Sequence, residues 1–302
     1  MSAYTTADLI ASVRVRGMFP DASQGSLSAD NILLLATEEL RLTIVPMILA
    51  VREKYYETYV DYPMVNGKGI YPIPLRAAGG ICSLVQFIVN QAVYNLTNID
   101  ATAVATTQTG LYPRGFYFQD NNIVLYPTPN ATTGTIRIRY YQRPSILINT
   151  TASSQVTSLD ATAGTVTLAA APTSWSSGVK YDFIPNVDPF SPYGIDSVLA
   201  NIDLSSNTLS FGTLPVNTDG TMLVSVGDWI APAGYSPVPG IPSEFFPLLA
   251  QTVACKLLEA VGDPNIAVAQ QKLQAYAQNA IRLITPREVF GLKKVKSDWR
   301  NF

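Results

Sequence analysis

The side chains that could carry chemistry are few and widely spaced. Histidine is absent from all 302 residues. This excludes nucleophile systems, metal sites and general bases that depend on imidazole. The two cysteines, Cys82 and Cys255, lie far apart in apolar surroundings. We therefore expect buried free thiols rather than a disulfide framework or a cysteine-rich metal site.

Carboxylates are the remaining candidates for acid–base or cation chemistry. Four aspartates of the central region do not follow the spacing of an EF-hand: Asp182, Asp188, Asp196 and Asp203. Glu38 and Glu39 are neighbours in a predicted helix and point in different directions, so they make a poor acid–base pair. The Gly67-Lys68 pair lies in an Asn-Gly turn, not in a phosphate-binding loop. We predict no enzyme, no metal and no cofactor; an enzyme that uses two carboxylates is a weaker alternative.

Charge is scarce in this chain relative to apolar content. Hydrophobic residues make up 47% of the sequence and charged residues 14%, against roughly 25% charged in ordinary globular domains. The formal net charge of −2 argues against a globally basic nucleic-acid binder. The most apolar segment, 32–51, has three charges near its middle, so we expect no membrane contact. Much of the surface is therefore expected to be buried against other subunits.

Two helices are predicted at the N-terminal end. Thr5 or Thr6 caps the first, which runs to Met18, and Ser28 caps the second. Pro46 is expected to kink the second helix, which fades near Tyr59. Its apolar face follows helical spacing: Leu33, Ala36, Leu40, Ile44, Met47 and Val51.

Two further helices are predicted near the C-terminal end. The third begins near Pro242 and stops at Gly262. Asp263 caps the fourth, which ends at Thr285-Pro286. The narrow apolar seam of the fourth predicts antiparallel packing against the third.

The middle of the chain has strand patterns in two regions that differ in amino-acid composition. A first antiparallel layer is predicted from four pieces: 69–74, 81–89, 116–126 and 135–141. The last of these alternates and should place Arg137 and Arg139 on an exposed face. Between 146 and 239, Thr, Ser, Asn, Gly and Pro dominate. We interpret this region as a small β-barrel or sandwich inserted between stiff linkers, at Arg143-Pro144 and 235–242.

The predicted fold class is therefore α+β. A helical bundle from the N- and C-terminal helices carries a small antiparallel β layer, and an all-β domain (barrel or sandwich) is inserted into it. The expected units are the N-terminal helices and β layer, the inserted β domain, the C-terminal helical hairpin and a C-terminal docking arm: 1–145, 146–239, 240–285 and 286–302.

The C-terminal arm combines positive charge with large apolar side chains. Residues 286–302 hold five basic and two acidic residues, a net charge of +3. Such a segment is typical of a tail that docks on a partner, and a tail folded back on its own core is the alternative. The docking residues we expect are Arg287, Phe290, Leu292, Lys293, Lys294, Lys296, Trp299, Arg300 and Phe302.

The order of these parts resembles the head-to-tail adaptor (connector) proteins of tailed bacteriophages, in particular the short-tailed type. The motifs that carry the resemblance are Pro113-Arg-Gly-Phe-Tyr-Phe-Gln-Asp-Asn-Asn-Ile-Val-Leu-Tyr-Pro-Thr-Pro, Thr135-Ile-Arg-Ile-Arg-Tyr-Tyr-Gln-Arg-Pro and Ile241-Pro-Ser-Glu-Phe-Phe. The first two motifs lie between the N-terminal and C-terminal helices, and the third opens the C-terminal helices. The resemblance covers about 28–145 and 240–302 and leaves out the inserted β region.

This resemblance implies a structural virion protein without enzymatic activity. It implies a ring, usually of twelve copies, that binds beneath the portal protein in the neck between head and tail. Assembly would take place in the cytoplasm of the bacterial host. Double-stranded DNA would pass through the lumen without specific binding. The partners implied are the portal protein, tail-nozzle or tail-fibre proteins, and further copies of this chain.

A different function stays open at the level of sequence. The β region could be a carbohydrate-binding or tail-fibre-attachment module of a virion, with aromatic side chains stacked on sugar rings. The candidates for such stacking are Trp175, Tyr181, Trp229 and Tyr235.

Overall fold

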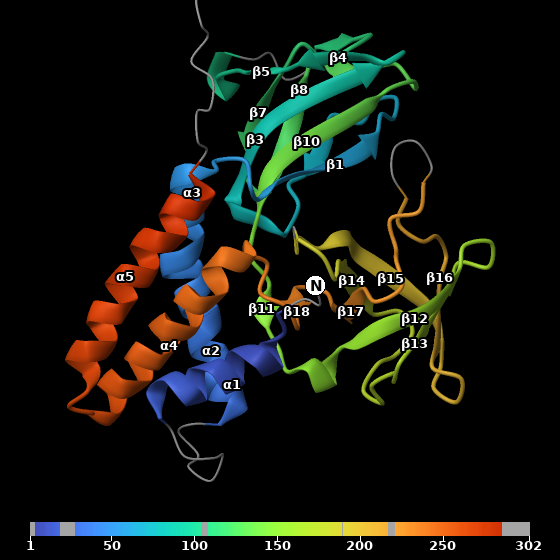
Figure 1. Ribbon diagram of the computed structural model, residues 1–302. Helices are drawn as coiled ribbons and strands as arrows, with labels where there is room; N and C mark the ends of the chain where they lie inside the picture. The colour runs from blue at the N-terminus through green and yellow to red at the C-terminus, as the bar shows by residue number, and fades with distance from the viewer. Residues whose placement is uncertain (1–3, 19–27, 104–107, 189, 217–220, 286–302) are drawn as a thin grey trace, which may run out of the picture.

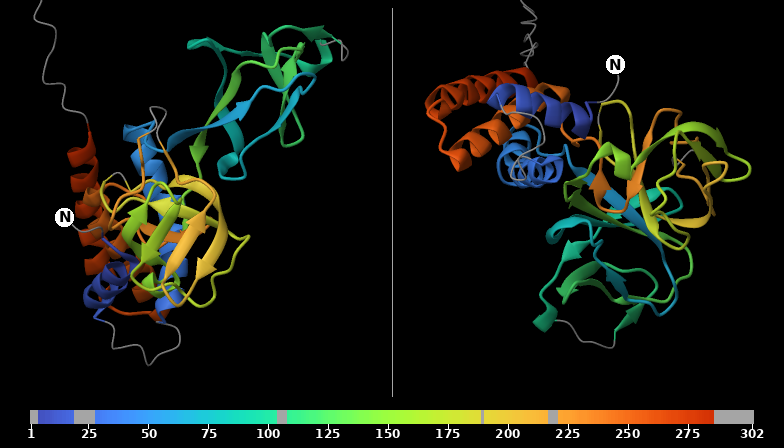
Figure 2. Two further views of the ribbon diagram at one scale, coloured as in Figure 1. Left: turned by 90° about the vertical axis from the view of Figure 1, so that its right-hand side faces the viewer. Right: turned by 90° about the horizontal axis from the view of Figure 1, so that it is seen from below.

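The computed structural model describes residues 4–18, 28–103, 108–188, 190–216 and 221–285. Helices from both ends of the chain form one module, and two separate β lobes extend from it (Figures 1 and 2). One lobe is a two-sheet sandwich and the other a closed six-stranded barrel. The predicted α+β class with an inserted all-β domain is confirmed, and that domain is a barrel.

The helical module begins with well-capped helices. Its α-helices are α1 (Thr6–Gly17), α2 (Ala29–Glu39), α3 (Val45–Val51), α4 (Phe246–Val261) and α5 (Ile266–Ile284). The Thr5 hydroxyl accepts the Asp8 N–H, and the Asp8 carboxylate accepts the Thr5 N–H at 2.9 Å, which is a capping box. The Ser28 side chain caps α2, and Gly262 ends α4 in a left-handed conformation. All three caps confirm the sequence prediction.

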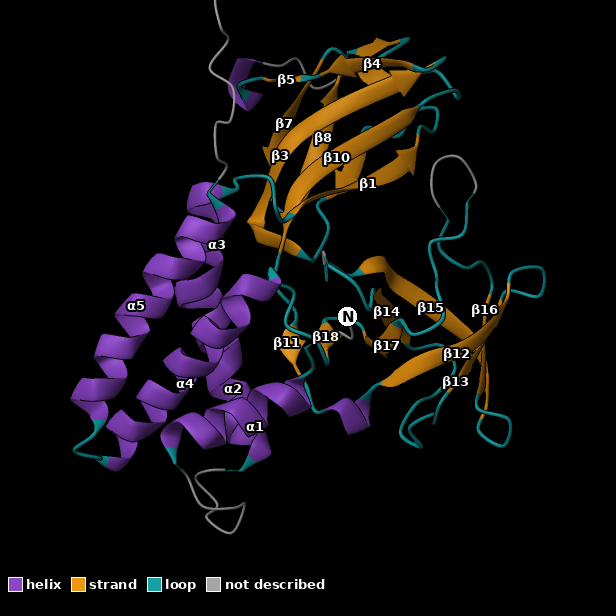
Figure 3. Ribbon diagram, viewed as in Figure 1, coloured by secondary structure: helices purple, strands orange, loops and turns teal. Residues whose placement is uncertain are grey.

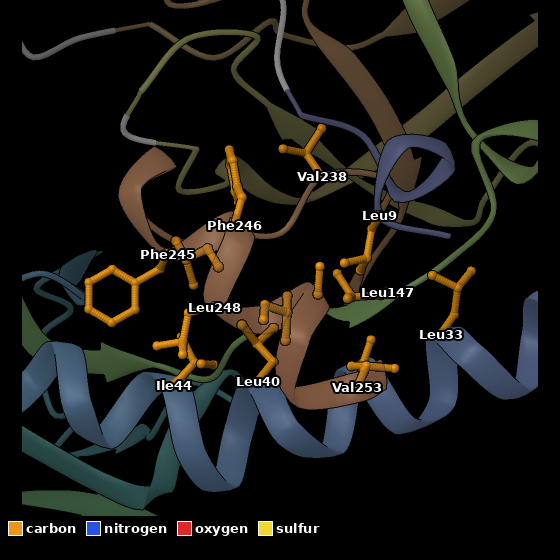
Figure 4. Close-up of a cluster of buried hydrophobic side chains, with 14 of the residues drawn as sticks. Leu9, Leu33, Leu40, Ile44, Leu147, Val238, Phe245, Phe246, Leu248 and Val253 are labelled. Atoms are coloured by element: carbon orange, nitrogen blue, oxygen red, sulfur yellow. The ribbon is translucent and has the colours of Figure 1, made fainter. Parts of the chain in front are cut away.

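Helix α4 lies at the centre of the module and packs against α1, α2 and α5 (Figure 3). The core gathers side chains from both ends of the chain, such as Leu9, Leu40 and Val253 (Figure 4). The N-terminal helices therefore bury their apolar faces only because α4 returns to them after the β lobes.

A π-helical turn, Leu40–Ile44, joins α2 to α3. The fully buried side chains on this stretch repeat strictly every four residues: Ile32, Ala36, Leu40, Ile44 and Ile48. An α-helix with 3.6 residues per turn would rotate such a row away from the core, and the wider π turn compensates for this drift. The predicted stripe is therefore wrong after Ile44. Met47 and Val51 are only partly buried, and Ile48 takes the core position.

Two helix ends also differ from prediction. The second helical run ends at Val51 rather than near Tyr59, and the strand β1 (Glu57–Pro63) follows. The aromatic and β-branched residues of this stretch have strand propensity, and pairing with β10 provides hydrogen-bond partners for the backbone groups on one side of the strand. Helix α5 begins at Ile266. Asp263 instead accepts the Asn265 N–H at 2.8 Å in the turn before it.

The sandwich consists of two facing sheets. The first sheet has the order β1, β10 (Thr135–Gln142), β3 (Ala77–Val89), β4 (Ala92–Asn95). The second has the order β2 (Ile70–Pro72), β8 (Asn122–Tyr126), β7 (Gly115–Gln119), β5 (Thr97–Asn98). Strand β10 alternates between buried and half-buried residues along its whole length, as predicted. Side chains of both sheets meet in one core.

The inserted barrel has a core of its own. Its strands, in spatial order, are β12 (Ser154–Asp160), β13 (Thr165–Leu168), β16 (Thr208–Phe211), β15 (Tyr193–Asp203), β14 (Lys180–Ile184) and β17 (Trp229–Pro232). Phe183, Leu199 and Phe211 fill its interior. Closure of the sheet leaves the barrel without free strand edges.

The predicted linkers on either side of the barrel pair with each other. Strand β11 (Ile146–Leu147) lies parallel to β18 (Tyr235–Ser236). The Leu147 N–H also donates to the hydroxyl of Thr37 on α2 at 3.0 Å. Entry to and exit from the barrel are thus tied together and to the helices. In the described part of the chain, the smaller elements are β6 (Thr109–Gly110), β9 (Thr128–Pro129) and three 3₁₀ turns, Ala101–Ala103, Thr150–Ala152 and Ser243–Phe245.

Candidate interaction surfaces

The barrel joins the helical module through apolar side chains. Ile184 of β14 and Ala231 of β17 are fully buried and belong to the same core as the helices. Phe190, in the loop after β14, packs its ring 5.7 Å from that of Phe246 at the start of α4. This apolar joint makes the helices and one side of the barrel a continuous core.

The sandwich joins the barrel through an ion pair. The Arg76 guanidinium, just before β3, lies 2.7 Å from the carboxylate of Asp182 on β14 and donates to the Ser145 hydroxyl at 3.0 Å. Asp182 is fully buried and also accepts the backbone N–H groups of Asp196 and Gly234, each at 2.9 Å. Each carboxylate oxygen therefore has a partner, as a buried charge requires.

The sandwich meets the helical module through further polar contacts. The buried Tyr56 hydroxyl donates to the Gly240 carbonyl at 2.9 Å, and Arg41 of the π turn donates to the Pro144 carbonyl at 3.0 Å. Burial lowers the pKa of Arg41, and the positive charges of Arg143 and Arg76 lower it further. We call these contacts, Arg76–Asp182, Tyr56–Gly240 and Arg41–Pro144, the polar joint. Three guanidinium groups lie together there, those of Arg41, Arg76 and Arg143.

A cleft of about 780 Å³ separates the sandwich from the barrel beside the polar joint. Tyr59, Tyr62 and Tyr140 line its sandwich wall, and Lys180 and Tyr193 line its barrel wall. Burial raises the pKa of Tyr140 to about 12. The walls carry hydroxyls and aromatic rings, but they do not bring carboxylates together for acid–base work.

The aspartates singled out in the sequence do not converge. Asp182 lies in the polar joint, the Asp196 carboxylate lies 3.8 Å from the Lys180 ammonium group, and Asp203 is the last residue of β15. Among the described residues, no group of three or more His, Cys, Asp or Glu side chains could hold a metal ion. Within that part of the chain, no helix is long and apolar enough to cross a membrane. Cys82 and Cys255 are buried free thiols, as expected.

The outer end of the sandwich carries an apolar surface with little charge. Between Arg76 and Arg114 the sequence has a single charged residue, Asp100. The rings of Tyr94 and Tyr112 pack against that of Phe87, and their neighbours in the chain, Val93 and Leu111, are exposed. We call these four residues the edge patch: Val93, Tyr94, Leu111 and Tyr112. Val93 and Tyr94 are each 54% exposed, and Leu111 is 63% exposed.

The edge patch has the composition of a protein interface. The Tyr94 and Tyr112 rings lie 6.2 Å and 5.0 Å from that of Phe87. Beside them, Leu111, Tyr112, Pro127 and the exposed Arg114 line a hollow of about 420 Å³. Tyrosine enrichment and depletion of charge mark the cores of interfaces, and grouped exposed apolar side chains mark contact sites. The sequence analysis did not identify this surface, although the charge-poor run between Arg76 and Arg114 was the available signal.

The two arginines of β10 lie on the outer face, as predicted, but they are paired within the sheet. Arg137 makes two hydrogen bonds to Asp61, at 2.8 and 2.7 Å, and lies 3.9 Å from the centre of the Tyr59 ring. The hydrogen bonds to Asp61 raise the pKa of Arg137. Arg139 donates to Gln86 at 3.1 Å. These arginines stabilise the sheet rather than form an open basic surface.

The candidate sugar-stacking aromatics do not form one exposed surface. Trp175 and Tyr181 are buried in the barrel core, with ring centres 4.7 Å apart. Trp229 is partly buried, and Tyr235 is 38% exposed. This contradicts the stacking role expected of Trp175 and Tyr181. The predicted docking arm, Arg287 to Phe302, lies outside the described residues.

Comparison with known proteins agrees with this architecture. Residues 4–171 match the family model described as SU10 adaptor protein. The match takes in the N-terminal helices, the sandwich and the first hairpin of the barrel, which is more than half of the chain. A search of curated proteins gave no match. The resemblance stated from the sequence motifs is confirmed, and the chain belongs to the SU10 adaptor protein family.

Proposed function

We propose that this protein is the structural head-to-tail adaptor of a tailed bacteriophage. Twelve copies form a ring below the portal protein, extend the DNA channel and join the portal to tail components. The edge patch is the observation that carries this proposal, because exposed aromatic and aliphatic side chains in a charge-poor stretch of the chain suit a subunit interface. The family assignment supports the same role.

The C-terminal arm is the portal-binding element of this proposal. Segment 286–302 combines a net charge of +3 with Phe290, Trp299 and Phe302. Large aromatic side chains serve as anchors in partner pockets, and the lysines and arginines steer the arm to acidic groups. Residues 1–145 and 240–285 form the body of the ring. Residues 146–239 form a barrel that points outward and contacts tail-nozzle or tail-fibre proteins.

The charge balance supports passage of DNA without retention. The whole chain has a net charge of −2, and the outer arginines of the sandwich are already paired, Arg137 with Asp61 and Arg139 with Gln86. A lumen rich in free arginine would bind phosphates and hold the DNA. We assign the protein to the virion neck, assembled in the host cytoplasm.

The decisive test is the mass of the purified chain in solution, alone and with its portal protein. A ring of about twelve copies, free or formed only on the portal, supports the proposal. A chain that stays monomeric and does not bind the portal overturns it.

A truncation tests the role of the arm. Deletion of 287–302 is expected to abolish portal binding in a pull-down while the helical module and both lobes remain folded by circular dichroism. Charge reversal of Lys293, Lys294 and Lys296 to Glu should weaken portal binding strongly at low salt. Lys272→Glu, an exposed lysine on α5, is the matched control and should bind normally. Unchanged assembly of the truncated chain on the portal contradicts this role.

A further inference from the structure

The first sheet of the sandwich has two strand edges at opposite sides. Among the described residues, β1 pairs only with β10, and β4 pairs only with β3. Each neighbour in the order β1, β10, β3, β4 is antiparallel, so β4 runs opposite to β1. A β1 strand from another copy laid along β4 therefore continues the antiparallel alternation.

The register of β4 shows which of its backbone groups point outward. The Leu96 N–H donates to the Val85 carbonyl at 2.9 Å, which marks a hydrogen-bonded pair. Because hydrogen-bonded and non-hydrogen-bonded pairs alternate along an antiparallel ladder, the N–H and C=O groups of Val93 and Asn95 turn away from β3. In the described part of the chain, no backbone group bonds to them.

The same reasoning applies to β1. The Gln142 N–H donates to the Tyr56 carbonyl at 2.8 Å, so alternate residues from Tyr56 onward face β10. The N–H and C=O groups of Tyr59 and Asp61 then point to the open side. The cleft beside the barrel borders this edge, with Tyr59 in its wall, so the edge is accessible.

We propose that β4 of one copy pairs with β1 of the next copy, so that the first sheet continues from subunit to subunit. The register places Val93 opposite Asp61 and Asn95 opposite Tyr59, and it satisfies the outward groups of both edges. Tyr94, exposed within the edge patch, then lies opposite Val60 and gains a covering neighbour. The proposal rests on the ring of the proposed function and names the contact that builds it.

The composition of β4 supports a pairing role. Free edges of soluble proteins are usually protected by charged side chains, proline or bulges. Strand β4 reads Ala-Val-Tyr-Asn and has none of these, and every one of its residues is exposed. The contact uses different edges on the two copies, so it is head-to-tail and can close into a ring.

A disulfide between copies tests the register directly. Val60 and Tyr94 would form a non-hydrogen-bonded pair across the contact, with Cα atoms about 4.5 Å apart, which suits a disulfide. Within one chain they lie three strands apart in the sheet, about 14 Å. That distance exceeds the limit of about 7 Å for a bond inside the subunit. The double variant Val60→Cys/Tyr94→Cys can therefore be joined through these thiols only between copies.

We expect the oxidised full-length double variant to give a ladder of covalent multimers on a non-reducing gel, and the ladder should disappear on reduction. Each single variant should give no ladder beyond a dimer, because one new thiol cannot link a chain on both sides. The control pair Val60→Cys/Val268→Cys, with the second cysteine on an exposed position of α5, should give no ladder. Efficient dimers from Tyr94→Cys alone, with no ladder from the pair, indicate a symmetric β4–β4 contact and overturn the proposal.

A backbone variant tests the hydrogen bonds. Val93→Pro removes an outward N–H and leaves the β3–β4 bonds in place, which is where an edge strand tolerates proline. We expect self-association to weaken about tenfold, the order of one lost hydrogen bond, while Val93→Thr assembles normally. If wild type and Val93→Pro form the same rings and the cysteine pair gives no ladder, this contact is wrong and the ring stands. If wild type forms no assembly with or without the portal, both proposals fail.

Discussion

The barrel and the sandwich are attached to the helices by different chemistry. At the apolar joint, Ile184 and Ala231 are part of the helical core. At the polar joint, the Arg76–Asp182 pair holds the sandwich to the barrel, and the Tyr56 and Arg41 hydrogen bonds hold it to the helical module. The sandwich has a hydrophobic core of its own, and it meets the helical core through aromatic side chains such as Tyr56 and Tyr141. The two lobes therefore differ in how easily they can move relative to the helices. Apolar packing is lost only by opening the core, whereas a polar joint can exchange its bonds with water.

This difference assigns the lobes different mechanical roles. The barrel moves with the helices as one body because its inner side is continuous with their core. The sandwich, which carries the edge patch, has a separate hydrophobic core and contacts the helical core through aromatic side chains such as Tyr56 and Tyr141. Four substitutions, taken from the largest expected effect to the smallest, test the comparison.

Asp182→Ala should have the largest effect. It leaves Arg76, whose side chain is 12% exposed, without its counter-charge and removes the acceptor of two backbone N–H groups. We expect a loss of about 3–5 kcal/mol in the free energy of unfolding, measured by urea denaturation. Labelling of the Cys82 thiol in the sandwich should also accelerate, while that of Cys255 in α4 changes little.

The control for this prediction is Asp182→Asn, which keeps a side-chain oxygen for the backbone N–H groups and should lose less stability than Asp182→Ala. A loss below about 1 kcal/mol for Asp182→Ala, the range of an exposed pair, means that the sandwich is held by something other than the ion pair.

Ile184→Ala tests the apolar joint. Removal of this fully buried side chain leaves a cavity between barrel and helices and should cost about 3 kcal/mol. Because the joint is part of the helical core, labelling of Cys255 should accelerate more than that of Cys82. Val187→Ala, at a 62% exposed position nearby, is the control and should change stability by no more than about 0.5 kcal/mol. Faster labelling of Cys82 alone would reverse the assignment of the two joints.

Tyr56→Phe removes one hydrogen bond of the polar joint and keeps the ring. The Gly240 carbonyl loses its hydroxyl donor, and we expect a loss of about 1 kcal/mol, read from thermal or urea unfolding. Tyr62→Phe, whose exposed hydroxyl donates to Pro72 at 3.3 Å, is the matched control with a smaller loss. Equal losses for the two variants contradict a special role for the Tyr56 contact.

The smallest effect is expected at the barrel end remote from both joints. Hydrogen bonds from Ser205 and Ser206 hold the pKa of the exposed Asp203 carboxyl at about 2, below its usual value near 4. A lowered folded-state pKa stabilises the protein above the unfolded value, and that contribution disappears as the pH falls from about 4 to about 2. NMR titration should find the Asp203 pKa raised in Ser205→Ala, with labelling of both cysteines unchanged. An unaltered pKa refutes the assigned cause.

Local patterns predicted the parts of this fold that local chemistry determines. The caps at Thr5, Ser28 and Gly262 and the alternation of β10 follow from neighbouring residues. The phase shift at Leu40–Ile44 was not predictable in this way, because it is set by what α4 brings against α2. The predicted helix extended into the start of β1, near Tyr59, because the partner strand β10 lies about 75 residues further along the chain.

Of the two candidate surfaces, one could be recognised from the sequence and the other could not. The edge patch left a trace in the sequence, since Asp100 is the single charge between Arg76 and Arg114. The polar joint left none, because Arg76 and Asp182 are 106 positions apart and each lies in an unremarkable local context. A contact between distant residues becomes visible only when the topology brings them together.

The split of the helical module between the two ends of the chain has a consequence for biosynthesis. Both β lobes are translated after α2 and before α4, an interval of about 200 residues. At roughly 5–20 residues per second, the ribosome needs about 10–40 s to cross it. Throughout that time the apolar row from Ile32 to Ile48 has no α4 to cover it, so the nascent chain is at its most vulnerable to aggregation while the lobes fold. The helical core therefore closes late. The N-terminal helices can complete their packing only after α4 has been synthesised.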